Sequence, residues 1–158
     1  VKVYSNKIYN QKLYIMKTIE NLNNLLSTSA VFYQNVRTYH WYVKGPRFFD
    51  LHEKFELLYT ETALTVDELA ERILMLEGKP LHSLTQYLSN SAIKETSTTT
   101  GADAMVNEVV EALEVILKIE RETLAEASEN NDDGTVSLMS DLIGKNEKHL
   151  WMFKAFLG

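Results

Sequence analysis

The chain has 158 residues, of which 45% are hydrophobic and 24% charged, and it carries a formal net charge of −6. With no signal peptide and no apolar run near the roughly 20 residues that a bilayer span needs, this composition predicts one globular, cytoplasmic domain without a membrane segment. The chain has no cysteine, which excludes disulfides and thiolate metal sites, so any metal must be held by imidazole and carboxylate.

Residues 1–17 are predicted to form an N-terminal arm of uncertain structure. Lys, an apolar residue and Tyr recur every five residues in KVYSN, KIYNQ and KLYIM, and about 500° per repeat aligns on no single helical face. The arm carries Lys2, Lys7, Lys12 and Lys17 without an acid, whereas residues 20–158 hold the other 12 bases against 22 acids, or −10. We expect this acidic body to repel nucleic acid and attract cations.

Four long helices are predicted in residues 18–158, over 18–43, about 50–76, 102–128 and 135–157. The Gly-Pro pair in KGPRF breaks the first, and Gly78 with Pro80 ends the second. A short helix over 83–91 lies in the long connection that ends in KETSTTTG, and the loop ENNDDG precedes the last helix. This order predicts an all-α four-helix bundle with a crossover between its second and third long helices.

One face of the second predicted helix carries a histidine and three carboxylates. Counted from His52 at about 100° per residue, His52, Glu56, Asp67 and Glu71 fall at roughly 0°, 40°, 60° and 100°. They flank the apolar stripe rather than lie within it. A solvated face alone explains Asp67 and Glu71, and packing alone explains a histidine beside Trp41, but the shared angle and spacing favour a metal site.

The spacing of these ligands predicts that two chains share the site. The pairs His52/Glu56 and Asp67/Glu71 are centred 15 residues apart, or about 22 Å, whereas metal–ligand bonds are about 2.0 to 2.2 Å. Two such helices packed antiparallel about a twofold axis near residues 61 and 62 bring opposite pairs together in two identical sites. His40 is expected to join His52, because a short loop brings the ends of their helices together.

A di-iron site within one bundle is not expected. Bundle di-iron enzymes place a Glu-x-x-His motif on each of two helices. None of the four histidines here has Glu three residues before it. His82 and His149 gain no metal partner from the spacing, and we expect both to be structural.

Three segments, YHWYVKGPRFFDLHEKFELLY, VDELAERILMLEGKP and KHLWMFKAFLG, resemble the Dps family of mini-ferritins, the DNA-binding proteins from starved cells. The resemblance covers roughly residues 18–158. Within the family, the sequence is similar to the variants found in low-GC Gram-positive bacteria. It implies a hollow homododecamer of ferritin-like bundles with ferroxidase centres across twofold interfaces. One subunit is then implied to supply His40, His52 and Glu56, and its partner Asp67 and Glu71. The family often has Asp at the position of Glu56.

The resemblance also implies a reaction. Fe(II) is oxidised, with hydrogen peroxide favoured over oxygen, and ferric mineral is stored in the cavity, which protects DNA from oxidative damage. The same ligands suit Zn, which is expected as a competitor. Trp41 matches a family tryptophan thought to donate an electron near the site, and interface packing explains it equally well.

Two further roles are implied by the resemblance. Acidic threefold pores admit iron in the family, and Glu129, Asp132 and Asp133 lie in about the right region, although helix caps and solvated charge explain such acids too. DNA-binding members use lysine-rich termini, which implies DNA contacts and nucleoid association for the arm with Lys2, Lys7 and Lys12. The arm also fits a segment that packs on its own cage, or an extended start before Met16.

Three functions therefore remain open from the sequence. The first is a ferroxidase and iron store. The second is an architectural protein that compacts DNA, and the third is a buffer that binds Zn or Fe without turnover.

Overall fold

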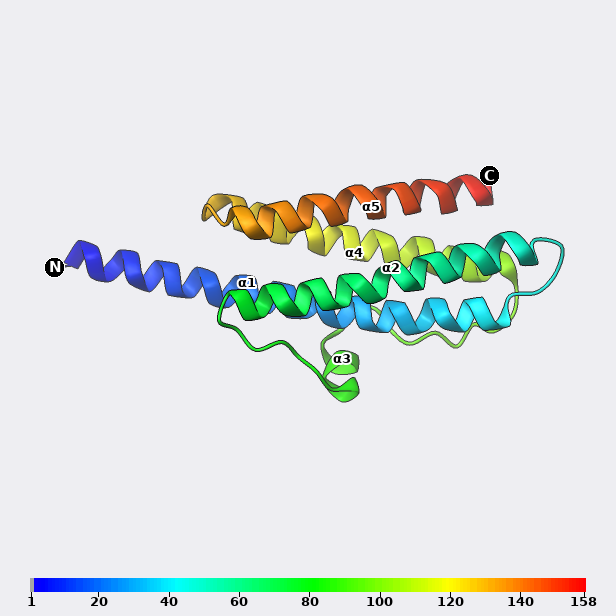
Figure 1. Ribbon diagram of the computed structural model, residues 1–158, viewed down its shortest axis with the longest axis horizontal. Helices are drawn as coiled ribbons and strands as arrows, with labels where there is room; N and C mark the ends of the chain where they lie inside the picture. The colour runs from blue at the N-terminus through cyan, green and yellow to red at the C-terminus, as the bar shows by residue number, and fades with distance from the viewer. Residues whose placement is uncertain (1) are drawn as a thin grey trace.

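The computed structural model describes the backbone of residues 2–158 and the side chains of residues 13–158. It contains five helices: α1 (Lys2–Tyr42), α2 (Phe48–Met75), α3 (Leu84–Asn90), α4 (Ala102–Glu129) and α5 (Asp133–Leu157). The four long helices form a bundle, and α3 lies in the connection from α2 to α4 (Figure 1). No strand occurs in residues 2–158, so the predicted bundle with a crossover helix is confirmed. None of the helices described is long and apolar enough to span a bilayer.

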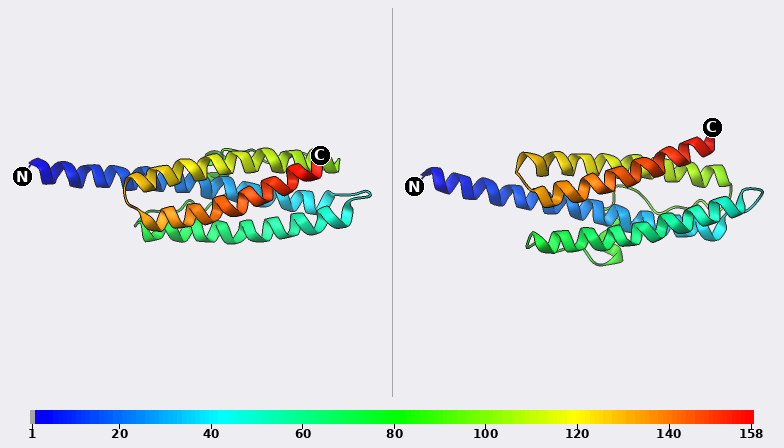
Figure 2. Two further views of the ribbon diagram at one scale, coloured as in Figure 1. Left: turned by 90° about the horizontal axis from the view of Figure 1, so that it is seen from above. Right: turned by 45° about the horizontal axis from the view of Figure 1, so that its top comes forward.

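The bundle is assembled from two antiparallel pairs, α1 with α2 and α4 with α5 (Figure 2). Each long helix turns an apolar stripe inward, as the 3.6-residue period requires. Fully buried side chains from the stripes include Leu22 and Leu25 of α1, Phe55 and Leu69 of α2, Leu113 of α4 and Met139 of α5. Burial of each such side chain stabilises the fold by roughly 1.5 to 3 kcal/mol.

The N-terminal segment is helical, so the predicted helix start at residue 18 is wrong. α1 begins at Lys2 and runs into the bundle without a break, because residues 2–42 contain neither Gly nor Pro to end it. The hydroxyl of Tyr14 donates to Asp132 at 3.0 Å, and Lys17 forms an ion pair with Glu126. These contacts hold α1 against the α4–α5 turn, while its first turns extend beyond the other helices (Figures 1 and 2).

The break between α1 and α2 lies at the predicted Gly-Pro pair. Gly45 has φ of 104°, a left-handed conformation that costs glycine little. Its carbonyl accepts from the backbone N–H of Phe48 at 3.0 Å, where α2 begins. The chain therefore reverses over residues 43–47 and places the last turn of α1 beside the first turn of α2.

Three asparagines of α1 hold the long crossover in place. Asn23 and Asn35 each donate to one backbone carbonyl of the crossover and accept from one of its N–H groups, and Asn24 donates to a third carbonyl, all at 2.8 to 3.2 Å. The crossover outside α3 has no regular backbone ladder, so these side chains satisfy groups that would otherwise be left unpaired.

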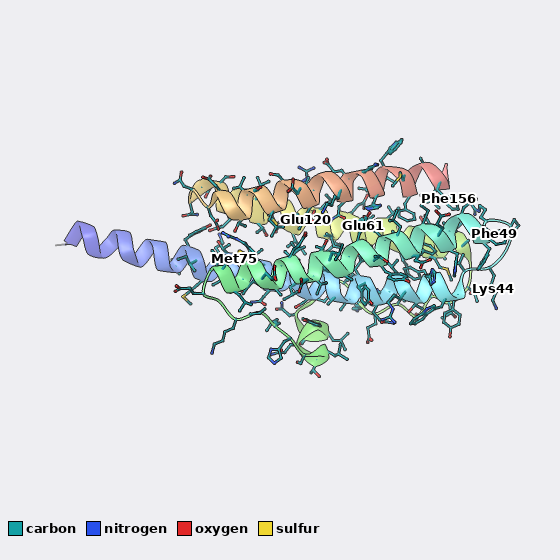
Figure 3. The ribbon with its side chains drawn as sticks, viewed as in Figure 1. Lys44, Phe49, Glu61, Met75, Glu120 and Phe156 are labelled. Carbon is teal, nitrogen blue, oxygen red and sulfur yellow. The ribbon has the colours of Figure 1, made fainter. Side chains whose placement is uncertain are left out.

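A carboxyl group is buried in the middle of the bundle. Glu120 of α4 has no solvent exposure, and its Oε1 accepts from Asn146 of α5 at 2.7 Å, whereas its Oε2 has no hydrogen-bond partner (Figure 3). Burial raises the pKa of Glu120 to about 8, and the bond from Asn146 and the charge of Arg121 offset only part of that effect. Glu120 is therefore neutral in the folded protein at pH 7.

This buried acid predicts a specific pH dependence of stability. A solvated glutamate carboxyl has a pKa of 4.5, whereas that of Glu120 in the folded chain is about 8, so folding takes up a proton between these two values. The contribution of Glu120 to the free energy of unfolding should be highest below pH 4.5. It should fall as pH rises toward 8, by at most about 1.4 kcal/mol per pH unit. Chemical denaturation of Glu120→Gln across this range should show a shallower decline.

The matched control is Glu122→Gln, because Glu122 lies on the same helix but is exposed. Its pH profile should equal that of the unmodified protein. A profile for Glu120→Gln that also equals it would contradict the assignment of a neutral buried acid.

Candidate metal centre

His40 and His52 form a closely packed pair at the break between α1 and α2. The Nδ1 atom of each ring lies 2.9 Å from the backbone carbonyl oxygen of the other residue. Their rings stack with centroids 3.8 Å apart and an interplanar angle of 18°. Because a carbonyl oxygen only accepts, each Nδ1 carries the hydrogen and donates it. In the neutral ring this leaves the lone pair on Nε2, the atom free to bind a metal ion.

The local backbone explains why this pair can form. α1 ends at Tyr42, so the carbonyl of His40 belongs to the last turn, whose carbonyls lack the usual intrahelical partner. His52 satisfies that carbonyl. The carbonyl of His52 has a second lone pair beyond its helical bond, and His40 donates to it. The two rings are thus oriented by the helix junction itself.

Two aromatic rings enclose the pair. Phe48 stacks on His52 with centroids 4.8 Å apart, and the rings of Tyr59 and His40 form a T-shaped pair with centroids 5.4 Å apart. Neither residue was predicted from the sequence. Tyr59 lies seven residues after His52, two helical turns along the same side of α2, so the helical wheel held a signal for it.

The three predicted carboxylate ligands lie exposed on the surface of α2. Glu56 follows His52 by one turn, and Asp67 and Glu71 lie farther along the same unbroken helix. Among the side chains described, no group of three or more His, Cys, Asp or Glu residues is close enough in one chain to hold a metal ion. The chain therefore brings together two of the five predicted ligands, and the distance along α2 keeps Asp67 and Glu71 apart from them.

Trp41 lies next to His40 in the sequence and contacts Arg37 of the same helix. Its side chain is 55% exposed. The guanidinium of Arg37 lies 4.8 Å from the centre of its ring, a cation–π contact. Of the two aromatic residues, it is Tyr59 and not Trp41 whose ring meets His40.

The acidic turn between α4 and α5 is built around Asp132, which caps α5. Its carboxylate accepts from the Thr135 backbone N–H at 3.1 Å, the Thr135 hydroxyl at 2.6 Å, Arg72 at 2.5 Å and Tyr14 at 3.0 Å. Burial alone would raise the pKa of Asp132, but the bonds from Thr135 and the charge of Arg72 outweigh it and lower that pKa. The sequence left a helix cap and solvated charge open as explanations of these acids, and the helix cap is present at Asp132. Glu129 and Asp133 are exposed, and their pore role stays a prediction.

The sequence predicts structural roles for His149 and His82 and DNA contacts for Lys2, Lys7 and Lys12. His149 is buried, and its Nε2 lies 2.6 Å from Glu61 of α2, so it links α2 to α5. His82 is exposed beside the cap of α3. The side chains of Lys2, Lys7 and Lys12 lie outside the described residues, and DNA contact by them stays a prediction.

Known proteins are similar to this chain over most of its length. The Ferritin-like domain family matches residues 19–158. DNA protection during starvation protein 2 of Bacillus anthracis is 40% identical over 141 residues, which cover 89% of this chain and 97% of that protein. A Haemophilus influenzae protein is 48% identical over 136 residues, which cover 86% of this chain and 85% of that protein. The similarity therefore extends beyond low-GC Gram-positive bacteria.

A solved structure shares the fold of this chain. The crystal structure of a Dps protein from Vibrio cholerae O1 matches with a TM-score of 0.90 and 42% identity, covering 92% of each chain, and that protein is described as one of the ferritin-like diiron-carboxylate proteins. Family match, sequence identity and fold agree: this chain belongs to the Dps family of mini-ferritins, and its all-α bundle is ferritin-like.

Proposed function

We propose that this protein is a ferroxidase and iron store whose metal sites are completed by two copies of the chain. His40, His52 and Glu56 of one copy would bind Fe(II) together with Asp67 and Glu71 of its partner. The observation that carries the proposal is the locked histidine pair, which leaves the Nε2 lone pair of each ring available to a metal ion, whereas the described side chains of one copy hold no complete cluster of three ligands by themselves.

The geometry of α2 supports a shared site. α2 is one continuous helix over 28 residues, so the spacing of about 22 Å between its two ligand pairs holds in three dimensions. An antiparallel partner helix places the carboxylate pair of one copy opposite the histidines of the other, twice by symmetry. A cage of twelve subunits, as the family resemblance implies, would contain six such twofold contacts.

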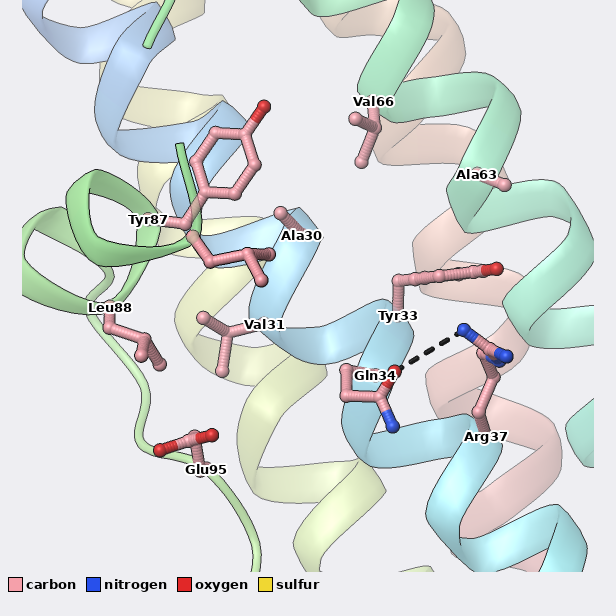
Figure 4. A pocket seen from close by; sticks show the side chains of 11 residues that line it. Ala30, Val31, Tyr33, Gln34, Arg37, Ala63, Val66, Tyr87, Leu88 and Glu95 are labelled. Carbon is pink, nitrogen blue, oxygen red and sulfur yellow. Dashed lines mark hydrogen bonds between the residues drawn. The ribbon is translucent and has the colours of Figure 1, made fainter. Parts of the chain in front are cut away.

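An apolar groove beside α2 supports pairing of two copies on this face. A cavity of about 590 Å³ lies between α1, α2 and α3, lined by Ala63, Val66, Leu88 and other residues (Figure 4). At its rim Leu84 is 79% exposed and Leu88 48% exposed. Covering such side chains with a second copy removes apolar surface from water.

Imidazole and carboxylate oxygen suit Fe(II) and also Zn, so we propose Fe(II) as the substrate and Zn as a competitor. Hydrogen peroxide accepts two electrons, and two Fe(II) ions at one site supply them together, which limits formation of hydroxyl radical. We propose peroxide as the favoured oxidant and deposition of the ferric product as mineral in the cage, which would protect DNA from oxidative damage.

Replacing Glu71 tests the ligand set. In Glu71→Ala, anaerobic loading with Fe(II) followed by peroxide should give little of the rapid rise in ferric absorbance, because the partner's half of the site is lost. The control is Glu68→Ala, which removes an exposed acid from the same helix but from a different face. It should oxidise Fe(II) as the unmodified protein does. Equal oxidation by the two variants would mean that the ligand set is wrong.

Mixing two inactive variants tests the sharing of the site. In a pair formed by His52→Ala and Glu71→Ala chains, one site loses both halves and the other keeps both. Random co-assembly of equal amounts should therefore restore about one quarter of the sites, measured as ferric absorbance after peroxide. Sites formed within single chains would give no recovery. Stoichiometric metal binding without consumption of peroxide would instead support a protein that buffers Zn or Fe without turnover.

DNA binding is a second candidate function, favoured by the cationic first turns of α1, which extend beyond the bundle. Deleting residues 1–13 removes Lys2, Lys7 and Lys12 but keeps the bond from Tyr14 to Asp132. The truncated protein should fail to retard DNA in a gel at low salt and should oxidise iron normally. Unchanged retardation would exclude the arm as the contact.

A further inference from the structure

A continuous series of aromatic contacts leads away from the histidine pair. Tyr59 of α2 meets His40 edge to face, with ring centroids 5.4 Å apart and planes at 78°. Tyr33 of α1 meets Tyr59 in the same way, at 6.0 Å and 79°. Tyr33 in turn lines the groove between α1, α2 and α3, where it points toward α2 (Figure 4). Two phenols therefore connect the proposed iron site to this groove.

The charge at the far end of the series distinguishes tyrosine from tryptophan as an electron donor. The guanidinium of Arg37 lies 5.1 Å from the centre of the Tyr33 ring and 4.8 Å from that of Trp41. Loss of an electron from an indole first leaves a positive charge, which this guanidinium disfavours. A phenol that gives up a hydrogen atom stays neutral, so the same charge opposes its oxidation much less.

We propose that Tyr59 and Tyr33 form a relay that removes single oxidising equivalents from the iron site. The inference rests on the proposed ferroxidase function and concerns a site that holds only one Fe(II). That ion gives one electron to hydrogen peroxide, the O–O bond breaks, and the products are Fe(III), hydroxide and one hydroxyl radical. Reduction of this hydroxyl radical to water requires a second electron, and a protein group in contact with the site must supply it.

Each step of the relay transfers one hydrogen atom. The phenolic O–H bond of Tyr59 breaks, its hydrogen atom converts the hydroxyl radical into water, and Tyr59 becomes a neutral radical. Tyr33 then passes one electron and its phenolic proton to Tyr59, which is restored, and the unpaired electron resides on Tyr33. The unpaired electron is thereby moved away from the metal ligands to the ring of Tyr33 in the groove.

The experiment uses the assembled full-length protein loaded anaerobically with one Fe(II) per site, mixed with one equivalent of peroxide and freeze-quenched. Electron paramagnetic resonance detects the radical, and optical absorbance of the same sample reports iron oxidation. Protein labelled with ring-deuterated tyrosine should give a narrowed spectrum, and protein labelled with indole-deuterated tryptophan an unchanged one. Tyr59→Phe, which keeps the ring contact with His40, should lose the early radical.

Three further variants complete the test. Tyr33→Phe should hold the radical on Tyr59, so that the early signal persists. Tyr42→Phe removes an exposed phenol of α1 outside the series, and Trp41→Phe removes the indole. Both should give the tyrosyl signal of the unmodified protein.

The outcomes separate the relay from the function on which it rests. Iron oxidation with a tyrosyl signal that survives in Tyr59→Phe, or with a tryptophan signal lost only in Trp41→Phe, would overturn the relay alone. Absence of any iron oxidation in the unmodified protein would overturn the ferroxidase function and the relay with it.

Discussion

The reciprocal hydrogen bonds between His40 and His52 are the interaction on which the proposed site depends. They require a sharp break in the chain, and Gly45 with Pro46 supplies it by reversing direction within residues 43–47. They also require an unpaired carbonyl, and the end of α1 at Tyr42 supplies that in His40. One helix junction thus satisfies its own backbone and fixes the tautomer of both rings. The proposed chemistry begins at two rings that the helix junction orients.

The interior of the bundle is not where the candidate ligands lie. Glu120 is the buried acid there, and its one partner is the amide of Asn146. His149 is engaged by Glu61, and among the described side chains no third ligand joins these groups. The described core consists mainly of packed apolar side chains, and the predicted carboxylate ligands lie exposed on the outer face of α2. A site placed on that face needs a second surface to close it, which would make assembly a condition for iron chemistry.

Much of this could be predicted from the sequence, because the signals are local. The Gly-Pro break, the ligand face of α2 and the long crossover follow from residue spacing and turn residues. The start of α1 could not be predicted from the five-residue repeat. A repeat that aligns on no single helical face gives no amphipathic signal for a helix, but it does not prevent one, whereas a Gly or Pro would interrupt it. The partners of Asp132 were beyond prediction, because Tyr14 and Arg72 are remote from it in sequence. Glu120 shares the inward stripe of Leu113 and Ile116, a signal that was present but unused.

The central claim is that iron binds between two chains, and anomalous scattering measures this most directly. Crystals soaked anaerobically with Fe(II) and measured at the iron absorption edge should show a peak bonded to Nε2 of His40 and of His52. The same peak should contact the carboxylates of Asp67 and Glu71 from the partner subunit. A peak held entirely by side chains of one subunit, or one remote from the histidine pair, would contradict the account.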